Sequence, residues 1–101
     1  MARVPSDATA FAHRQKKMMA QVAAIYASPD EGAVHEEWVS DTVDALRQGD
    51  TAAYVNFVGD EGEARVHDAY PDATWKRLAE IKRRYDPDNV FRLNQNIPPA
   101  A

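Results

Sequence analysis

The chain has 101 residues, of which 45% are hydrophobic and 28% charged, and its formal net charge at pH 7 is −4. These values are typical of one small soluble domain; the acidic balance disfavours general binding of nucleic acid, and no apolar run approaches the roughly 20 residues of a membrane-spanning helix. The absence of cysteine excludes a disulfide framework, a thiolate metal site and a cysteine nucleophile.

The three histidines, His13, His35 and His67, are far apart in the sequence and show no metal-ligand spacing. Residues 1–14 lack the basic stretch and the apolar stretch of a secretory signal. We therefore expect a single cytoplasmic domain, residues 1–101, that holds no metal and contacts neither nucleic acid nor a membrane.

The N-terminal part of the chain predicts a β-hairpin. Small and larger side chains alternate over residues 8–14, and a second alternating segment follows at 18–26. The polar residues 15–17 mark the turn, although the second segment is rich in alanine, which is depleted in strands. We expect the two strands to pair in antiparallel fashion.

A helix is predicted next. Ser28, Pro29 and two acidic residues form a typical helix start, and apolar side chains recur at helical spacing from Val34 to Leu46. Gly49 suits the position after the last turn because glycine tolerates a positive φ. The helix should therefore begin after Ser28 and end before Gly49.

A third strand is predicted over residues 51–58, where aromatic and β-branched side chains lie between two Gly-Asp turn signals. A short helix should follow within 61–69 and a longer one from 71 to about 85, because Pro87 disfavours helical backbone at the preceding residue. The expected fold is α+β in the order β-β-α-β-α-α: a small antiparallel sheet, made of the hairpin and one further strand, packed with two to three helices.

Tyr54 and Asn56 are the strongest candidates for chemistry, since alternation along the predicted strand puts a phenol and an amide on one face. A phenol acts as a general base only when its pKa, about 10 in water, is lowered by a cation or by hydrogen bonds. The alternative is a structural pair, in which the tyrosine is partly buried with a satisfied hydroxyl and the asparagine lies on an edge strand.

Two charged segments predict structure rather than chemistry. Residues 76–84 carry five basic side chains and one acidic one, which would suit a phosphate or an acidic partner but more often forms a solvated helix face. Residues 86–89 alternate carboxylates as a calcium loop does, yet the glycine and the closing glutamate of such a loop are missing. We expect a turn there.

Four motifs follow one another in the second half of the chain. They are Tyr54-Val55-Asn56-Phe57, Ala69-Tyr70, Arg77-Leu78-Ala79-Glu80-Ile81-Lys82-Arg83-Arg84-Tyr85-Asp86-Pro87-Asp88-Asn89-Val90-Phe91 and Asn94-Gln95-Asn96-Ile97-Pro98. Together they resemble the C-terminal region of FAD-linked oxidases of the berberine bridge enzyme type. Residues 51–99 look like the berberine-bridge-enzyme-like segment of that family, and residues 1–50 look like the end of the preceding substrate domain.

The resemblance implies part of a flavoprotein oxidoreductase. Such enzymes bind FAD in an N-terminal domain, often covalently, and a substrate domain with an antiparallel sheet roofs the flavin. They oxidise an alcohol, a sugar or a natural product, and oxygen commonly reoxidises the flavin. By this resemblance the catalytic base is Tyr54, and Asn56 is a neighbour of the flavin or the substrate.

The chain departs from the family pattern in two respects. Pro71 follows Ala69-Tyr70 where the family usually has glycine, and the whole FAD-binding portion is absent. A cofactor's chemistry depends on a protein that positions and tunes it. We therefore expect FAD chemistry only with an FAD-binding domain or subunit as partner.

Three hypotheses follow for the function. In the first, the chain is the C-terminal part of such an oxidoreductase and is inactive alone. In the second, it is a standalone flavin-free module that acts in binding or in homo-oligomer assembly, for example as a dimer that covers exposed apolar surface. In the third, it binds flavin at an oligomer interface, which a retained yellow colour would reveal.

Overall fold

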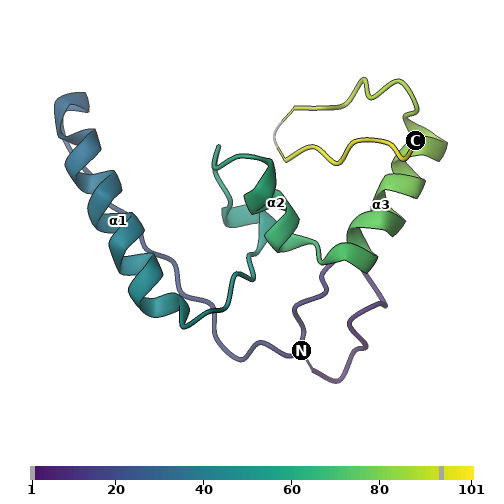
Figure 1. Cartoon of the computed structure of the whole chain (residues 1–101), viewed down its shortest axis with the longest axis horizontal. Coiled ribbons are helices and arrows are strands. Elements are labelled where there is room, and N and C mark those ends of the chain that lie inside the picture. The colour runs from purple at the N-terminus through teal and green to yellow at the C-terminus, as the bar shows by residue number, and fades with distance from the viewer. Residues whose placement is uncertain (1, 94) are drawn as a thin grey trace. The chain divides into compact units, whose positions relative to one another are not determined.

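The computed structural model describes residues 2–93 and 95–101, and its regular structure is helical (Figure 1). The elements in chain order are the 3-10 turn η1 (Pro29–Glu31), helix α1 (Gly32–Arg47), the 3-10 turn η2 (Val55–Phe57), helix α2 (Glu63–Ala69) and helix α3 (Asp72–Tyr85). Asn94, which opens the last sequence motif, lies outside the described residues. The chain divides into two compact units: residues 18–51, and residues 1–17 together with 52–101.

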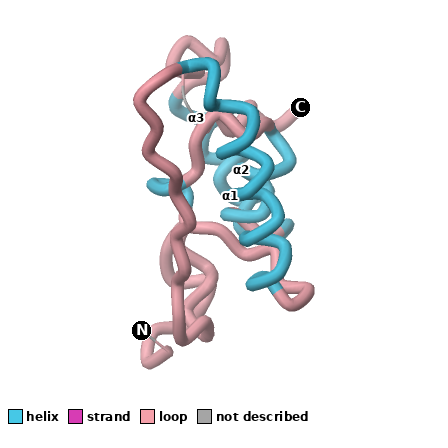
Figure 2. Tube along the Cα trace, turned by 90° about the vertical axis from the view of Figure 1, so that its left-hand side faces the viewer, coloured by secondary structure: helices cyan, strands magenta, loops and turns pink. Residues whose placement is uncertain are grey.

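The predicted α+β fold is wrong, because the described residues contain three α-helices and no strand (Figure 2). Residues 8–14 and 18–26 are loops, and a local turn occupies the first of them, where Arg14 N donates to Ala12 O at 2.9 Å. A two-stranded hairpin is marginally stable by itself. The alanines of these segments add little of the cross-strand side-chain packing that stabilises a sheet.

The segment predicted as the third strand forms a turn instead. Tyr54 O accepts a hydrogen bond from Phe57 N at 2.9 Å, and Val55 O accepts one from Val58 N at 3.2 Å, which together form η2. A β-branched and aromatic stretch becomes a strand only where a neighbouring strand satisfies its backbone groups. The described residues provide no such neighbour, so these backbone groups bond locally.

Helix α1 is the regular part of the unit formed by residues 18–51. A capping box precedes it, in which Ser28 Oγ accepts from Asp30 N at 3.4 Å and Glu31 Oε2 accepts from Ser28 N at 3.2 Å. Gly49 follows the helix with a φ of +82°. The helix predicted between Ser28 and Gly49 is therefore confirmed.

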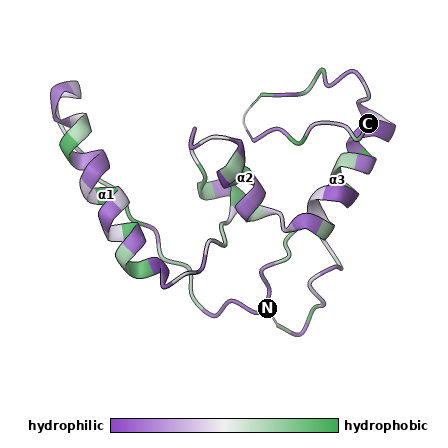
Figure 3. Ribbon diagram, viewed as in Figure 1, coloured by the Kyte–Doolittle hydropathy of each residue, from purple (hydrophilic) through white to green (hydrophobic). Residues whose placement is uncertain are grey.

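Apolar and polar residues alternate along the ribbon of α1 (Figure 3). The Tyr26 ring stacks on His35, with ring centroids 5.3 Å apart, which holds the preceding loop against the helix. Val34, Trp38 and Leu46 remain exposed.

The other unit has a small core around α2 and α3. Its buried hydrophobic side chains are Val58, Val66, Ala69 and Ala79. His67 at the end of α2 stacks on Trp75 of α3, with ring centroids 4.2 Å apart, and this contact joins the two helices. The helices predicted within 61–69 and 71–85 are confirmed. In the described part of the chain, none of the helices has both the length and the apolar character needed to cross a bilayer.

Candidate functional site

The Tyr54 and Asn56 side chains meet at η2. Asn56 Nδ2 donates a hydrogen bond of 2.8 Å to the Tyr54 hydroxyl oxygen. Tyr54 precedes the 3-10 turn and Asn56 lies within it, so the turn brings together two side chains that an extended strand would hold about 6.7 Å apart. The turn therefore joins a phenol to an amide that donates to its oxygen.

Two phenylalanines flank the Tyr54 ring. Phe11 contacts it edge-on, with ring centroids 5.6 Å apart and an angle of 82° between the rings. Phe57 lies at the same centroid distance, 5.6 Å, with an angle of 50°. Tyr54 is 38% exposed and Phe57 is 51% exposed. The site is thus an open aromatic surface that carries one polar pair.

Tyr70 is a second phenol in the same unit, and its electrostatics differ from those of an accessible base. Burial raises the pKa of Tyr70, and the negative charge of an ionised Tyr54 raises that pKa further. Tyr70 is therefore a weaker candidate for a proton acceptor than an ordinary phenol.

The N-terminal segment is fastened to the helices on both sides of Phe11. His13 Nε2 forms a 2.8 Å hydrogen bond with the backbone oxygen of Asp68, and because a carbonyl only accepts, the ring nitrogen is the donor. Arg77 Nη1 donates to Asp7 O at 2.7 Å. These two contacts hold Phe11 beside the Tyr54 ring, so His13 has a structural role here.

The turn predicted at residues 86–89 is confirmed by a 3.1 Å hydrogen bond from Asn89 N to Asp86 O. The Asp86 carboxylate also accepts bonds from Lys82 Nζ, from Val90 N at 2.8 Å and from Phe91 N at 3.0 Å. The hydrogen bond from Lys82 is the largest cause that holds the pKa of Asp86 below its ordinary value. Throughout residues 2–93 and 95–101, no three histidine or carboxylate side chains are grouped to hold a metal ion.

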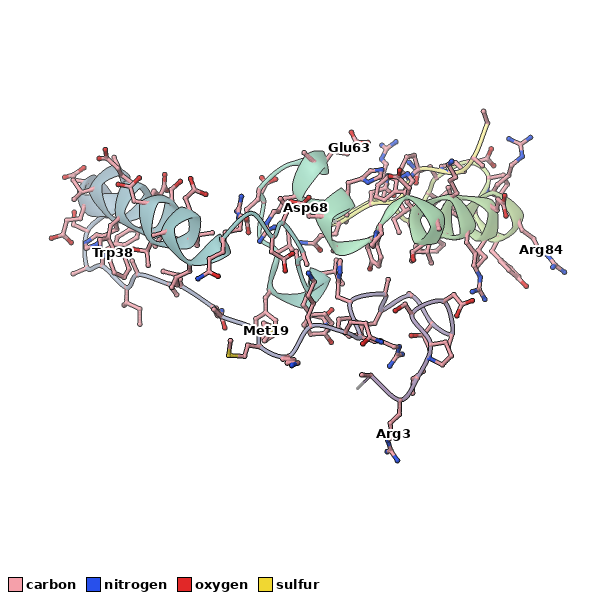
Figure 4. All side chains as sticks on the ribbon, turned by 60° about the horizontal axis from the view of Figure 1, so that its bottom comes forward. Arg3, Met19, Trp38, Glu63, Asp68 and Arg84 are labelled. Atoms are coloured by element: carbon pink, nitrogen blue, oxygen red, sulfur yellow. The ribbon has the colours of Figure 1, made fainter. Side chains whose placement is uncertain are left out.

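Several basic side chains of α3 bind backbone oxygens of the same unit. Arg77 donates to Asp7 O, Lys82 to Phe91 O, and Arg83 to Ala100 O at 2.8 Å. Arg84 extends from the C-terminal end of the helix (Figure 4), and its guanidinium lies 5.3 Å from the centroid of the Tyr85 ring. Arg77, Lys82 and Arg83 are therefore occupied in holding loops onto α3.

Residues 53–98 of the chain match the family model described as "Berberine and berberine like". The predicted resemblance to FAD-linked oxidases of the berberine bridge enzyme type is confirmed. The matched berberine-like segment contains Tyr54, Asn56 and the whole of α2 and α3.

Curated relatives of the chain include FAD-linked oxidoreductases and berberine bridge enzyme-like proteins. The chain is 33% identical over 100 residues to the uncharacterized FAD-linked oxidoreductase YvdP of Bacillus subtilis, across 99% of this chain and 22% of the relative. It is 30% identical over 118 residues to berberine bridge enzyme-like 17 of Arabidopsis thaliana, across 100% of this chain and 22% of the relative. It is 32% identical over 97 residues to the uncharacterized FAD-linked oxidoreductase YgaK of Bacillus subtilis, across 96% of this chain and 21% of the relative.

The chain spans about a fifth of the length of these berberine-like relatives. Their names place FAD at the level of the family. In this chain, the polar pair Tyr54 and Asn56 and the exposed ring of Phe57 fit contact with one edge of a flavin ring or of a substrate. The sequence has no glycine-rich loop to bind a diphosphate. The residues present therefore suit contact with a flavin's ring and not with its diphosphate.

Proposed function

We propose that this chain forms the C-terminal part of a cytoplasmic FAD-linked oxidoreductase that oxidises an alcohol, a sugar or a natural product, and that the chain is inactive alone. Its partner is the FAD-binding domain or subunit. The observation that carries the proposal is the hydrogen bond from Asn56 to the Tyr54 hydroxyl, within an open aromatic surface of the berberine-like segment.

In this proposal Tyr54 lies over the flavin and is the general base. As a phenolate it takes the proton from the substrate's hydroxyl group while the carbon that bears this group loses a hydride, which leaves a carbonyl. Bound FAD supplies the hydride acceptor. Asn56 stabilises the phenolate by its hydrogen bond, and Phe11 and Phe57 cover part of the Tyr54 ring.

The first measurement is the visible absorption spectrum of the purified chain, before and after FAD is added and the excess removed. The proposal expects a colourless protein, because the chain lacks residues for the cofactor's diphosphate. A retained flavin band would contradict the expectation that the chain needs a partner, and would favour flavin binding at an oligomer interface.

The catalytic roles are tested in a chimera, in which this chain replaces the matching residues of the Bacillus subtilis protein YvdP. The probes are primary alcohols and reducing sugars, and the readout is the rate of flavin reduction without oxygen. Tyr54→Phe should slow the reduction by about 10²–10⁴-fold, the usual contribution of a general base. Asn56→Ala should slow it less, because the phenol remains. Tyr85→Phe, which removes an exposed phenol at the end of α3, is the control. Undiminished reduction in Tyr54→Phe would refute the base assignment.

The second candidate function is a standalone flavin-free module that acts in binding or in homo-oligomer assembly. It is favoured by Val90, Phe91 and Leu93, whose side chains are 68%, 81% and 87% exposed. A chain that unfolds cooperatively as a defined dimer, and whose chimera reduces no flavin, would favour this module over the oxidoreductase.

A further inference from the structure

The segment that carries Tyr54 and Asn56 has no sheet to hold it. It consists of Tyr54 and the 3-10 turn η2, which is closed by the bonds from Phe57 N to Tyr54 O and from Val58 N to Val55 O. A single turn of this kind is weakly stabilised by its own bonds. The position of the polar pair in the folded unit therefore depends on tertiary contacts made by the end of the turn.

Gln95 makes such a contact. Its side-chain Nε2 donates a hydrogen bond to Val58 O and a longer one, of 3.5 Å, to Gly59 O. The Val58 side chain is buried, with 8% of it exposed, and Val58 N closes the turn through its bond to Val55 O. Val58 thus joins the Gln95 side chain to the turn that carries Asn56.

The C-terminal tail that carries Gln95 is fastened at its other end to α3. Ala100 N donates to Ala79 O at 3.0 Å, and Arg83 Nη1 donates to Ala100 O at 2.8 Å. Figure 1 shows the tail returning to the side of α3, where the chain ends. Gln95 therefore connects η2 to the helix through a tail that is itself held.

We propose that Gln95 is a positioning residue, which fixes η2 against the C-terminal tail and so holds Tyr54 and Asn56 in their hydrogen-bonded arrangement. The catalytic part of this inference rests on the proposed function. A neutral amide suits the task, because it donates to carbonyl oxygens without bringing a charge into a half-buried position. A glutamate of the same size has no such donor at neutral pH and repels the same oxygens.

The structural part is tested by nuclear magnetic resonance on the chain itself. Gln95→Ala and Gln95→Glu should each shift the side-chain amide signals of Asn56 and the ring signals of Tyr54, because the turn moves. Circular dichroism should show that the helices remain in both variants. Gln15→Ala, which removes an exposed glutamine from a loop of the same unit, is the matched control. If the Tyr54 and Asn56 signals stay unchanged in both Gln95 variants, the inference is wrong.

The catalytic part is tested in the YvdP chimera with a double-mutant cycle. Gln95→Ala should slow flavin reduction about tenfold to hundredfold, as a small misplacement of a catalytic group does. In a chimera that already carries Tyr54→Phe, Gln95→Ala should have no further effect, since no base remains to be positioned. An equal loss in both backgrounds would overturn the positioning role. Full activity of the Tyr54→Phe variant alone would refute the proposed base. This result does not depend on Gln95, so a failure of the proposed function is distinguished from a failure of the positioning role.

Discussion

The Asp86 carboxylate accepts several hydrogen bonds at the end of α3. Its two oxygens accept from Lys82 Nζ, Val90 N and Phe91 N, and its side chain is 12% exposed. Lys82 Nζ also donates to Phe91 O. Hydrogen bonds thus join the Lys82 ammonium, the Asp86 carboxylate and the backbone up to Phe91 at the end of α3. The ionised carboxylate is the form that these donors favour.

The pKa of Asp86 should therefore lie below its ordinary value of 3.8. Because the folded state lowers this pKa, the carboxylate stabilises the fold fully above about pH 4, where the unfolded chain is also ionised, and the stabilisation is lost as the pH falls through the folded-state pKa. Titration of the Asp86 carboxyl carbon by nuclear magnetic resonance measures the value directly. Lys82→Met removes the largest cause and should move the pKa of Asp86 upward. A pKa at or above 3.8 in the unaltered chain would contradict this account.

At the scale of elements, α1 depends on the capping box that precedes it. Ser28 and Glu31 satisfy backbone donors at the start of the helical segment. Ser28→Ala should lower the free energy of unfolding of this segment by about 1 kcal/mol, the usual effect of a lost cap. Hydrogen exchange at the first α1 amides is the measurement, since fraying begins at the uncapped end.

Ser40→Ala is the control for the cap, because Ser40 lies exposed in the middle of α1. There, the same substitution should leave the helix equally or slightly more stable, since alanine has the higher helix propensity. Equal exchange at the first amides of the Ser28→Ala variant and the unaltered chain would exclude a stabilising role for the box.

The helices were predictable because their signals are local. A helix start at Ser28 and Pro29, an apolar stripe and Gly49 bound α1, and Pro87 limits α3. The strand predictions were wrong, because alternation and β-branched residues form a strand only beside a partner strand, which the described residues lack. Tyr54 and Asn56 do meet, yet a 3-10 turn and not strand alternation brings them together.

Long-range contacts left no pattern in the sequence. Phe11 packs on Tyr54, and Gln95 donates to Val58 O, across many intervening residues in each case. Gln95 stands in one of the family motifs, which could have singled it out, but its partner could not be identified from the sequence alone. Phe11 had no such signal. The surroundings of the candidate site are therefore a property of the folded unit, whereas its two central residues were found from the sequence.

At the scale of the whole molecule, the chain combines a small core with a large exposed apolar surface. The unit with α2 and α3 buries Val58, Val66, Ala69 and Ala79. In the same unit Phe91 is 81% exposed and Leu93 is 87% exposed. Since the chain spans about a fifth of its relatives, the rest of such a protein would be large enough to cover these side chains.

Two substitutions distinguish the small core of the unit from its exposed surface. Val66→Ala should destabilise the isolated chain by about 1.5 kcal/mol, because it removes two buried carbon groups. Phe91→Ser should change the stability of the isolated chain by less than about 0.5 kcal/mol, as an exposed side chain does. In the YvdP chimera, however, Phe91→Ser should cost about 2 kcal/mol if the added protein buries this ring. Denaturant unfolding of both proteins, followed by tryptophan fluorescence, gives all three values. Equal small effects of Phe91→Ser in the chain and in the chimera would mean that the ring stays in water in both, and that the added protein docks elsewhere.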